Sequence, residues 1–259
     1  MDAAAFLQTL TADRTGLEVT VLLVIAFVAG LARGFSGFGA ALIFMPVASA
    51  IVTPQVAAPL ILVVDIVMAL PMLPAAWARA DRRDVGIMAI GALIGVPLGG
   101  VALALADPLW IRWGIVLAVV SLLGLLASGW RYRGRPTPPL TIGVGITSGL
   151  FSGAAQIGGP PIVVYWLGGI IPAVTVRANI VLYFAISSLI TAVTYLAAGL
   201  IGLTVLLLTV LTAPFYGAGI YAGSRLFGLA TERTFRRICF GLIAVAAIIG
   251  LPLLDHVIR

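Results

Sequence analysis

One glycine-rich motif occurs twice in the chain, each time between two apolar segments. Gly30–Gly39 reads GLARGFSGFG and Gly149–Gly158 reads GLFSGAAQIG, so glycine, leucine, glycine and glycine hold the same four places. Matching apolar segments that glycine or proline interrupts are typical of the binding sites of secondary transporters built from two repeats. The duplication therefore predicts two repeats around a shared site.

The composition requires lipid around most of the chain. Hydrophobic residues make up 62% of the 259 residues and charged residues only 9%. A water-soluble fold of this size needs a polar exterior, which these residues cannot supply. We therefore expect an all-α polytopic membrane protein with about ten helical segments, since a membrane-spanning helix needs about 20 apolar residues.

The apolar segments fall into two length classes. Six are long enough to cross the membrane, or nearly so: 57–77, 85–106, 109–129, 178–198, 205–229 and 238–254. Four are too short alone and flank the two motifs: 19–32, 40–52, 140–151 and 161–171. Interrupted backbone is tolerated in a membrane only where it is buried or lines a cavity. We expect the short segments to form broken or re-entrant helices.

Arginine-rich loops predict how the spans are oriented. Arginines cluster at 79–83, 131–135 and 233–237 but are absent from 107–108 and 199–202, which places the first three loops in the cytoplasm. Corresponding spans of the two halves then run in opposite directions, so we expect inverted repeats and alternating access. The predicted division is a first repeat at 1–130, a cytoplasmic linker at 131–139 and a second repeat at 140–259.

The sequence has no pattern typical of an enzyme or a metal site. His256 is the only histidine and Cys239 the only cysteine, so no metal-ligand cluster and no nucleophile–base spacing occurs. We expect no catalysis, no cofactor and no metal. Because the arginines lie mostly between apolar segments, we interpret them as topology signals and do not expect nucleic acid as a partner.

The two motifs are candidate anion-binding elements. Helix N-termini expose N–H groups with a partial positive charge, and glycines let a ligand approach the backbone closely. The candidate substrate-binding residues are Ser36, Gly37, Phe38 and Gly39 in the first motif, and Gln156, Gly158 and Gly159 in the second. The alternative is that the glycines only allow close helix packing in lipid.

Charged residues extend the candidate site. Arg33 and Arg177 can bind an oxyanion by charge-assisted hydrogen bonds, although either can instead be an arginine at the membrane interface. Asp65 lies within a span and is a candidate for proton coupling, with a hydrogen bond to a broken helix as the alternative. No acid occurs between Asp107 and Glu232, which favours an anionic solute.

The passage Gly149–Leu167, which contains QIGGPPIVVY, resembles the second signature of the TauE/SafE family of membrane exporters. Gly34–Pro46 looks like the first signature, and Arg177-Ala178-Asn179 is similar to the family's Arg-Ala step. The resemblance covers nearly the whole chain and implies export of sulfite or a related sulfur-containing anion across the bacterial inner membrane. Ala40 and Gln156 stand where the family often has glycine.

Residues and resemblance together predict a multi-pass secondary transporter that exports a small anion, with sulfite first, by alternating access. Proton coupling stays open. The expected partners are the anionic substrate and membrane lipid, and a homodimer also stays open. The alternatives are an anion channel on the same scaffold and a structural subunit of a membrane complex that transports nothing.

Overall fold

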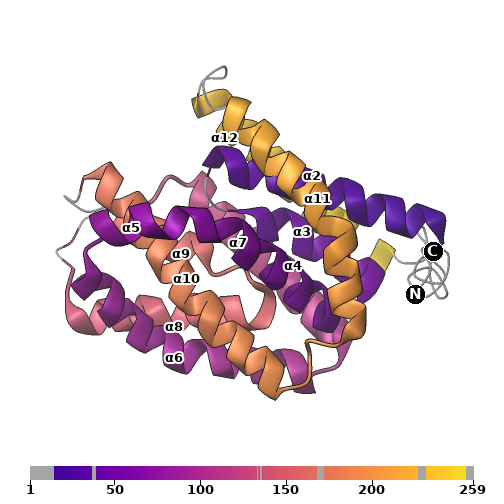
Figure 1. Cartoon of the computed structure of the whole chain (residues 1–259), viewed down its shortest axis with the longest axis horizontal. Coiled ribbons are helices and arrows are strands. Elements are labelled where there is room, and N and C mark those ends of the chain that lie inside the picture. Colours follow the sequence, from indigo (N-terminus) through magenta and orange to yellow (C-terminus); the bar gives the residue numbers. More distant parts are fainter. Residues whose placement is uncertain are drawn as a thin grey trace.

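The computed structural model describes residues 15–36, 39–132, 134, 136–167, 172–226 and 232–254, and every regular element in these ranges is helical (Figure 1). The α-helices are α2 (Gly16–Ser36), α3 (Ala40–Val52), α4 (Pro54–Ala69), α5 (Leu73–Arg79), α6 (Arg82–Leu105), α7 (Pro108–Ala127), α8 (Pro138–Ala155), α9 (Gly159–Trp166), α10 (Ala173–Ala197), α11 (Leu203–Leu226) and α12 (Glu232–Ile249). Short 3₁₀ turns follow α4 at Leu70–Met72 and α12 at Pro252–Leu254.

The helices confirm an all-α polytopic membrane protein. Within the described ranges, 6 helical segments are long and apolar enough to cross a membrane. They are Gly16–Phe35, Pro54–Arg79, Arg82–Leu105, Pro108–Ala127, Val174–Ala197 and Leu203–Leu226. The second of these joins α4, the 3₁₀ turn and α5, where prolines at 71 and 74 remove backbone donors and interrupt the α-helical pattern.

The structure corrects the expected lengths of three segments. We expected 238–254 to be nearly long enough to cross, but the apolar part of α12, Arg237–Ile249, is one of the shorter helices. We expected 19–32 and 140–151 to be too short; α2 has 21 residues and is one of the six spans, while α8 has 18 residues and is not. Both helices continue into the glycine-rich motif, because its first two glycines are helical and face neighbouring helices. The short helices are α3, with 13 residues, and α9, with 8, which at 1.5 Å per residue fall well short of a hydrocarbon core about 30 Å thick.

Glycines line the contacts of two parallel helix pairs. A Cβ added to α6 at positions 91, 95 or 99 would overlap carbonyl oxygens of α8, at Ile142, Ile146 and Leu150 in that order. A Cβ added to α11 at 219 or 223 would overlap those of α2, at Phe27 and Leu31. Each pair joins the first helix of one repeat to a late helix of the other, with the close backbone approach that small residues allow in membranes.

Corresponding helices of the two repeats run in opposite directions. α10 begins beside α6, where the Asp81 N–H donates to Asn179 Oδ1 at 2.7 Å, and the Thr194 side chain lies against Gly100 near the other end of both helices. α10 and α6 are therefore parallel, and α11 returns antiparallel after the turn at 198–202. Since α2 is parallel to α11 and α8 to α6, α2 and α8 are antiparallel, which confirms the inverted repeats.

Two of the three loops expected in the cytoplasm, 79–83 and 131–135, lie at the same end of the bundle. The Tyr132 N–H donates to Val164 O at 3.2 Å, and Trp166 Nε1 donates to Asp84 Oδ2 at 2.6 Å, so the segments around 84, 132 and 166 lie together. At the other end, Gln55 Nε2 donates to the last carbonyls of α6. The division at 131–139 stays a prediction, while α7 ends at Ala127 and α8 begins at Pro138.

Candidate functional site

A cavity of about 50 Å³ lies where α3 and α9 begin. By the same measure one water needs about 10–15 Å³, so this space suits a few waters or one small ion. α3 runs from the cavity to the end of the bundle where α4 begins, and α9 runs to the opposite end, where Trp166 meets Asp84. Two short helices that run apart in opposite directions thus point their N-termini at one space.

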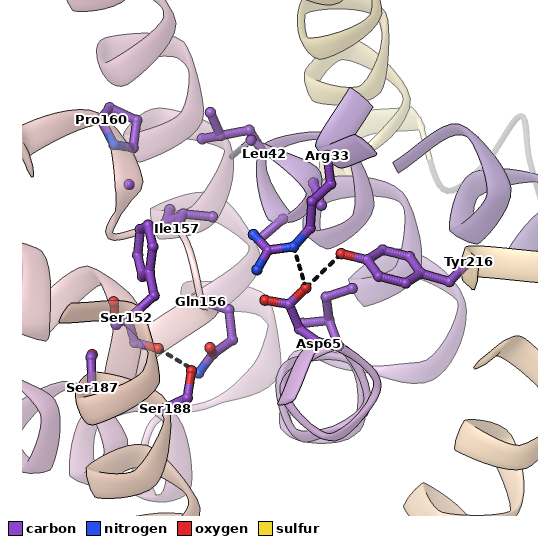
Figure 2. Close-up of a pocket in the computed structure, with 16 residues that line it drawn as sticks. Arg33, Leu42, Asp65, Ser152, Gln156, Ile157, Pro160, Ser187, Ser188 and Tyr216 are labelled. Carbon is purple, nitrogen blue, oxygen red and sulfur yellow. Dashed lines mark hydrogen bonds and ion pairs between the residues drawn. The ribbon is translucent and has the colours of Figure 1, made fainter. Parts of the chain in front are cut away.

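The first repeat and α11 build a charged wall of this cavity (Figure 2). Arg33 Nε on α2 lies 2.6 Å from Asp65 Oδ1 on α4, and the two side chains are 17% and 24% exposed. The Tyr216 hydroxyl on α11 donates to the same oxygen at 2.8 Å. Arg33 is therefore paired inside the bundle, and its interpretation as an arginine at the membrane interface is not supported.

The second repeat builds a neutral polar wall opposite, with Ser152 and Gln156 beside the start of α9 and Ser187 and Ser188 on α10. The Ser187 side chain is 2% exposed. Among the described residues its hydroxyl makes no hydrogen bond of good geometry, although the Tyr183 hydroxyl lies near it. An unpaired buried hydroxyl costs free energy unless a ligand or water meets it. This wall offers hydroxyl donors without charge.

Gln156 ends α8 in the left-handed conformation, at φ 60. Its Nε2 donates to Ser152 O at 2.9 Å and reaches the Tyr195 hydroxyl only at 3.5 Å. The first bond caps the helix, and the second lies at the limit of hydrogen bonding. One amide N–H of Gln156 is thus committed to α8, while the other is held weakly beside the cavity.

The two helix starts differ in the donors that they offer. Gly39 precedes α3 at φ 91, which favours glycine. Gly158 precedes α9, and a Cβ there would overlap Ser148 and Ser152. Prolines at 160 and 161 follow in the first turn of α9 and carry no N–H, so α9 presents fewer backbone donors to the cavity than α3.

The structure brings some of the predicted site residues together and leaves others apart. Those that line the cavity are Arg33, Gly39, Asp65, Gln156 and Gly159. Gly158 lies next to it, and its carbonyl accepts from Ser148 Oγ at 2.8 Å. Arg177 is exposed on α10 and does not line the cavity. Gly37, Phe38 and the side chain of Ser36 lie outside the described residues.

The packing interpretation of the motif holds for its first two glycines. Positions 30 and 34 face the α11 backbone, and positions 149 and 153 face the α6 backbone. Among the glycines of the motif that the structure describes, the last one of each copy stands at the start of a short helix beside the cavity. The duplicated motif therefore combines helix packing at its beginning with site construction at its end.

The sequence interpretation missed four polar residues that line the cavity: Ser152, Ser187, Ser188 and Tyr216. The motif alignment carried a signal for one of them, because Ser152 occupies the place in the second copy that Arg33 occupies in the first. The other three lie on α10 and α11, whose spans read as ordinary apolar sequence. Among the described residues, no group of three His, Cys, Asp or Glu side chains could hold a metal ion.

Comparison with known proteins gives one match. The family model described as "Sulfite exporter TauE/SafE" matches residues 22–249. No curated protein and no solved structure matches the chain. The matched range contains both glycine-rich motifs and every described residue that lines the cavity.

Proposed function

The chain belongs to the TauE/SafE family of membrane transporters, which are not enzymes, and from this we propose that it exports a small anion, sulfite or a related sulfur-containing anion, by alternating access. The bacterial inner membrane is the proposed location. The anion would bind between the two repeats, in the cavity at the starts of α3 and α9.

One observation carries this proposal: two short helices from inverted repeats start at one polar cavity in the middle of the bundle. Their N-termini supply partial positive charge, which favours an anion. Arg33 adds a full positive charge, and the serine wall adds hydroxyl donors. Such a site at the interface of inverted repeats is typical of alternating access.

Each predicted residue has a proposed role. Arg33 and the weakly held N–H of Gln156 donate to the anion from opposite sides, and Gly39 and Gly159 let it approach backbone N–H groups. Ser36, Gly37, Phe38 and Gly158 remain proposed parts of the same site. Arg177, exposed on α10, would act at a distance by raising the local anion concentration, an effect that salt screens over about 8 Å.

Ser187→Ala tests the site with two measurements, the thermal stability of the empty protein and its affinity for sulfite. Removing a buried hydroxyl that makes no hydrogen bond of good geometry should leave the thermal stability of the empty protein nearly unchanged. A hydrogen bond to a charged ligand contributes about 1.5–3 kcal/mol, so sulfite affinity should fall about tenfold or more. Ser128→Ala, at an exposed serine after α7, is the control. Unchanged sulfite affinity in folded Ser187→Ala would show that the anion does not bind at this wall of the cavity.

Gln156→Gly tests the second candidate donor without backbone strain. Glycine adopts the left-handed conformation at this position freely, whereas alanine would be strained at φ 60. The variant loses the amide but keeps the turn between α8 and α9, so weaker sulfite binding would report on the side chain. Equal sulfite affinity in Gln156→Gly and in the unmodified protein would show that the Gln156 side chain caps α8 but does not bind the anion.

Exchange flux separates a transporter from a channel on the same scaffold. Proteoliposomes that contain the protein are loaded with sulfite, and entry of isotope-labelled sulfite is measured. Internal sulfite should accelerate entry, because an alternating-access carrier returns faster when occupied. Flux that internal sulfite does not accelerate would favour the channel, and the absence of any sulfite flux would favour the structural subunit.

A further inference from the structure

The cavity contains a partly buried acid, Asp65, that is already paired with the positive charge an anion would need. Asp65 Oδ1 accepts two contacts, from Arg33 Nε at 2.6 Å and from the Tyr216 hydroxyl at 2.8 Å. Figure 2 shows the second carboxylate oxygen turned away from Tyr216, on the side of the cavity that Gln156 occupies. Terminal nitrogens of Arg33 also point to that side.

The charges around this cavity sum to zero before any ligand enters. Among the described lining residues, Arg33 and Asp65 are the charged ones. The other polar groups that face them are uncharged: Tyr216 from α11, Ser152 and Gln156 from the α8–α9 segment, and Ser187 and Ser188 from α10, while α3 contributes only alanine and leucine. An anion that entered would make the site net negative, with two negative charges sharing one guanidinium.

A net negative charge in a space with so little water is unfavourable, because neither solvent nor a second cation screens the repulsion. The Asp65 side chain is 24% exposed and lines the cavity, so water can deliver a proton to it. Protonation removes the repulsion and leaves the charge of Arg33 for the incoming anion. The carbonyl oxygen of the neutral acid can still accept hydrogen bonds from Arg33 and Tyr216.

We propose that Asp65 is a proton-binding site coupled to anion binding, so that one proton enters the cavity with each singly charged anion. This inference rests on the proposed anion site. The proton passes from water to the Asp65 oxygen that faces the cavity and forms an O–H bond there. It returns to water when the anion leaves, so neither a redox partner nor a cofactor takes part. A permanently ionised pair that only holds α2 to α4 is the alternative.

Proton counting by calorimetry distinguishes proton binding by Asp65 from a permanently ionised Arg33–Asp65 pair. Sulfite is titrated into the purified full chain in buffers that differ in ionisation enthalpy, which gives the protons bound per anion. Asp65→Asn mimics the neutral acid, and Asp107→Asn is the control, because Asp107 only caps α7 and asparagine caps equally well. The unmodified protein and Asp107→Asn should take up about one proton more per sulfite than Asp65→Asn, since the ligand's own protonation cancels in the difference.

Binding itself should survive in Asp65→Asn, because the cavity then carries the net charge that the anion requires. Equal proton counts, or loss of sulfite binding by folded Asp65→Asn, would overturn the coupling while leaving the export proposal in place. If Asp65→Asn does not fold, infrared difference spectra of the unmodified protein decide. A protonated-carboxyl band that appears when sulfite is added supports the inference, and no such band rejects it.

The same titration separates failure of the coupling from failure of the function. If the unmodified protein binds neither sulfite nor methanesulfonate, the anion export and the proton site are both rejected. In proteoliposomes, a pH gradient should drive net sulfite movement by the unmodified protein. Asp65→Asn should exchange sulfite across the membrane but no longer respond to the gradient, and a retained response would also overturn the inference.

Discussion

Disrupting the Arg33–Asp65 pair tests the charged wall directly by a double-mutant cycle. The atoms Arg33 Nε and Asp65 Oδ1 lie 2.6 Å apart, and the side chains are 17% and 24% exposed. Charge centres about 4 Å apart attract each other by about 4 kcal/mol at an effective dielectric constant of about 20. Cavity water and desolvation offset part of this, so we expect a coupling free energy of about 2 kcal/mol.

Either single substitution should cost more than the pair itself contributes. Arg33→Ala or Asp65→Ala leaves the other, partly buried charge without its ionic partner, for which a loss of about 3 kcal/mol of unfolding free energy is expected. The double variant should then be more stable than the sum of the single losses predicts. Unfolding is followed by circular dichroism in mixed micelles with increasing denaturing detergent. Losses that add within about 0.5 kcal/mol would show that these two residues do not interact.

Two further predictions concern packing and topology. Gly219→Ala places a Cβ against the α2 backbone and should lower the unfolding free energy by about 1–3 kcal/mol. Gly114→Ala on α7, where a Cβ meets nothing within 4 Å, should be neutral or raise it slightly, by at most about 1 kcal/mol. Equal thermal shifts would contradict the close α2–α11 contact. In a Cys239→Ser background, a cysteine replacing exposed Gly202 should react with an impermeant reagent outside intact cells, and one replacing exposed Arg83 should not. The reverse labelling pattern would show that the protein has the opposite orientation in the membrane from the predicted one.

The sequence was sufficient to predict the class of fold, because hydrophobicity and repeat spacing are read directly from the residues. Charged loops and span lengths also predicted inverted repeats, which the helix directions confirm. The expected helices near the motif were shorter than α2 and α8 are, although only α2 is among the helices long and apolar enough to cross. Glycine was taken there as an interruption, whereas packing against a neighbouring helix stabilises glycine within both.

Cavity residues were harder to predict, because their role depends on contacts between distant parts of the chain. Asp65 and Arg33 stood out as charges in apolar surroundings, but nothing in the spacing indicates that they pair with each other and with Tyr216. Ser187 lies in an apolar span like other membrane serines, many of which bond to their own helix. Only the folded chain distinguishes a serine whose hydroxyl makes no hydrogen bond of good geometry from one that is satisfied locally.

The two walls of the cavity differ chemically although their backbones correspond. Arg33 and Ser152 hold the same place in the two motif copies, so the positive charge belongs to the first repeat and the matching hydroxyl to the second. In the alternating access proposed above, the two repeats would exchange conformations while the charge stayed with α2 and α4. A ligand shifts a conformational equilibrium only through differential affinity. An anion that accepts from Arg33 and the serines together favours conformations that bring the walls together, and Asp65 neutralises the same arginine when no anion is present.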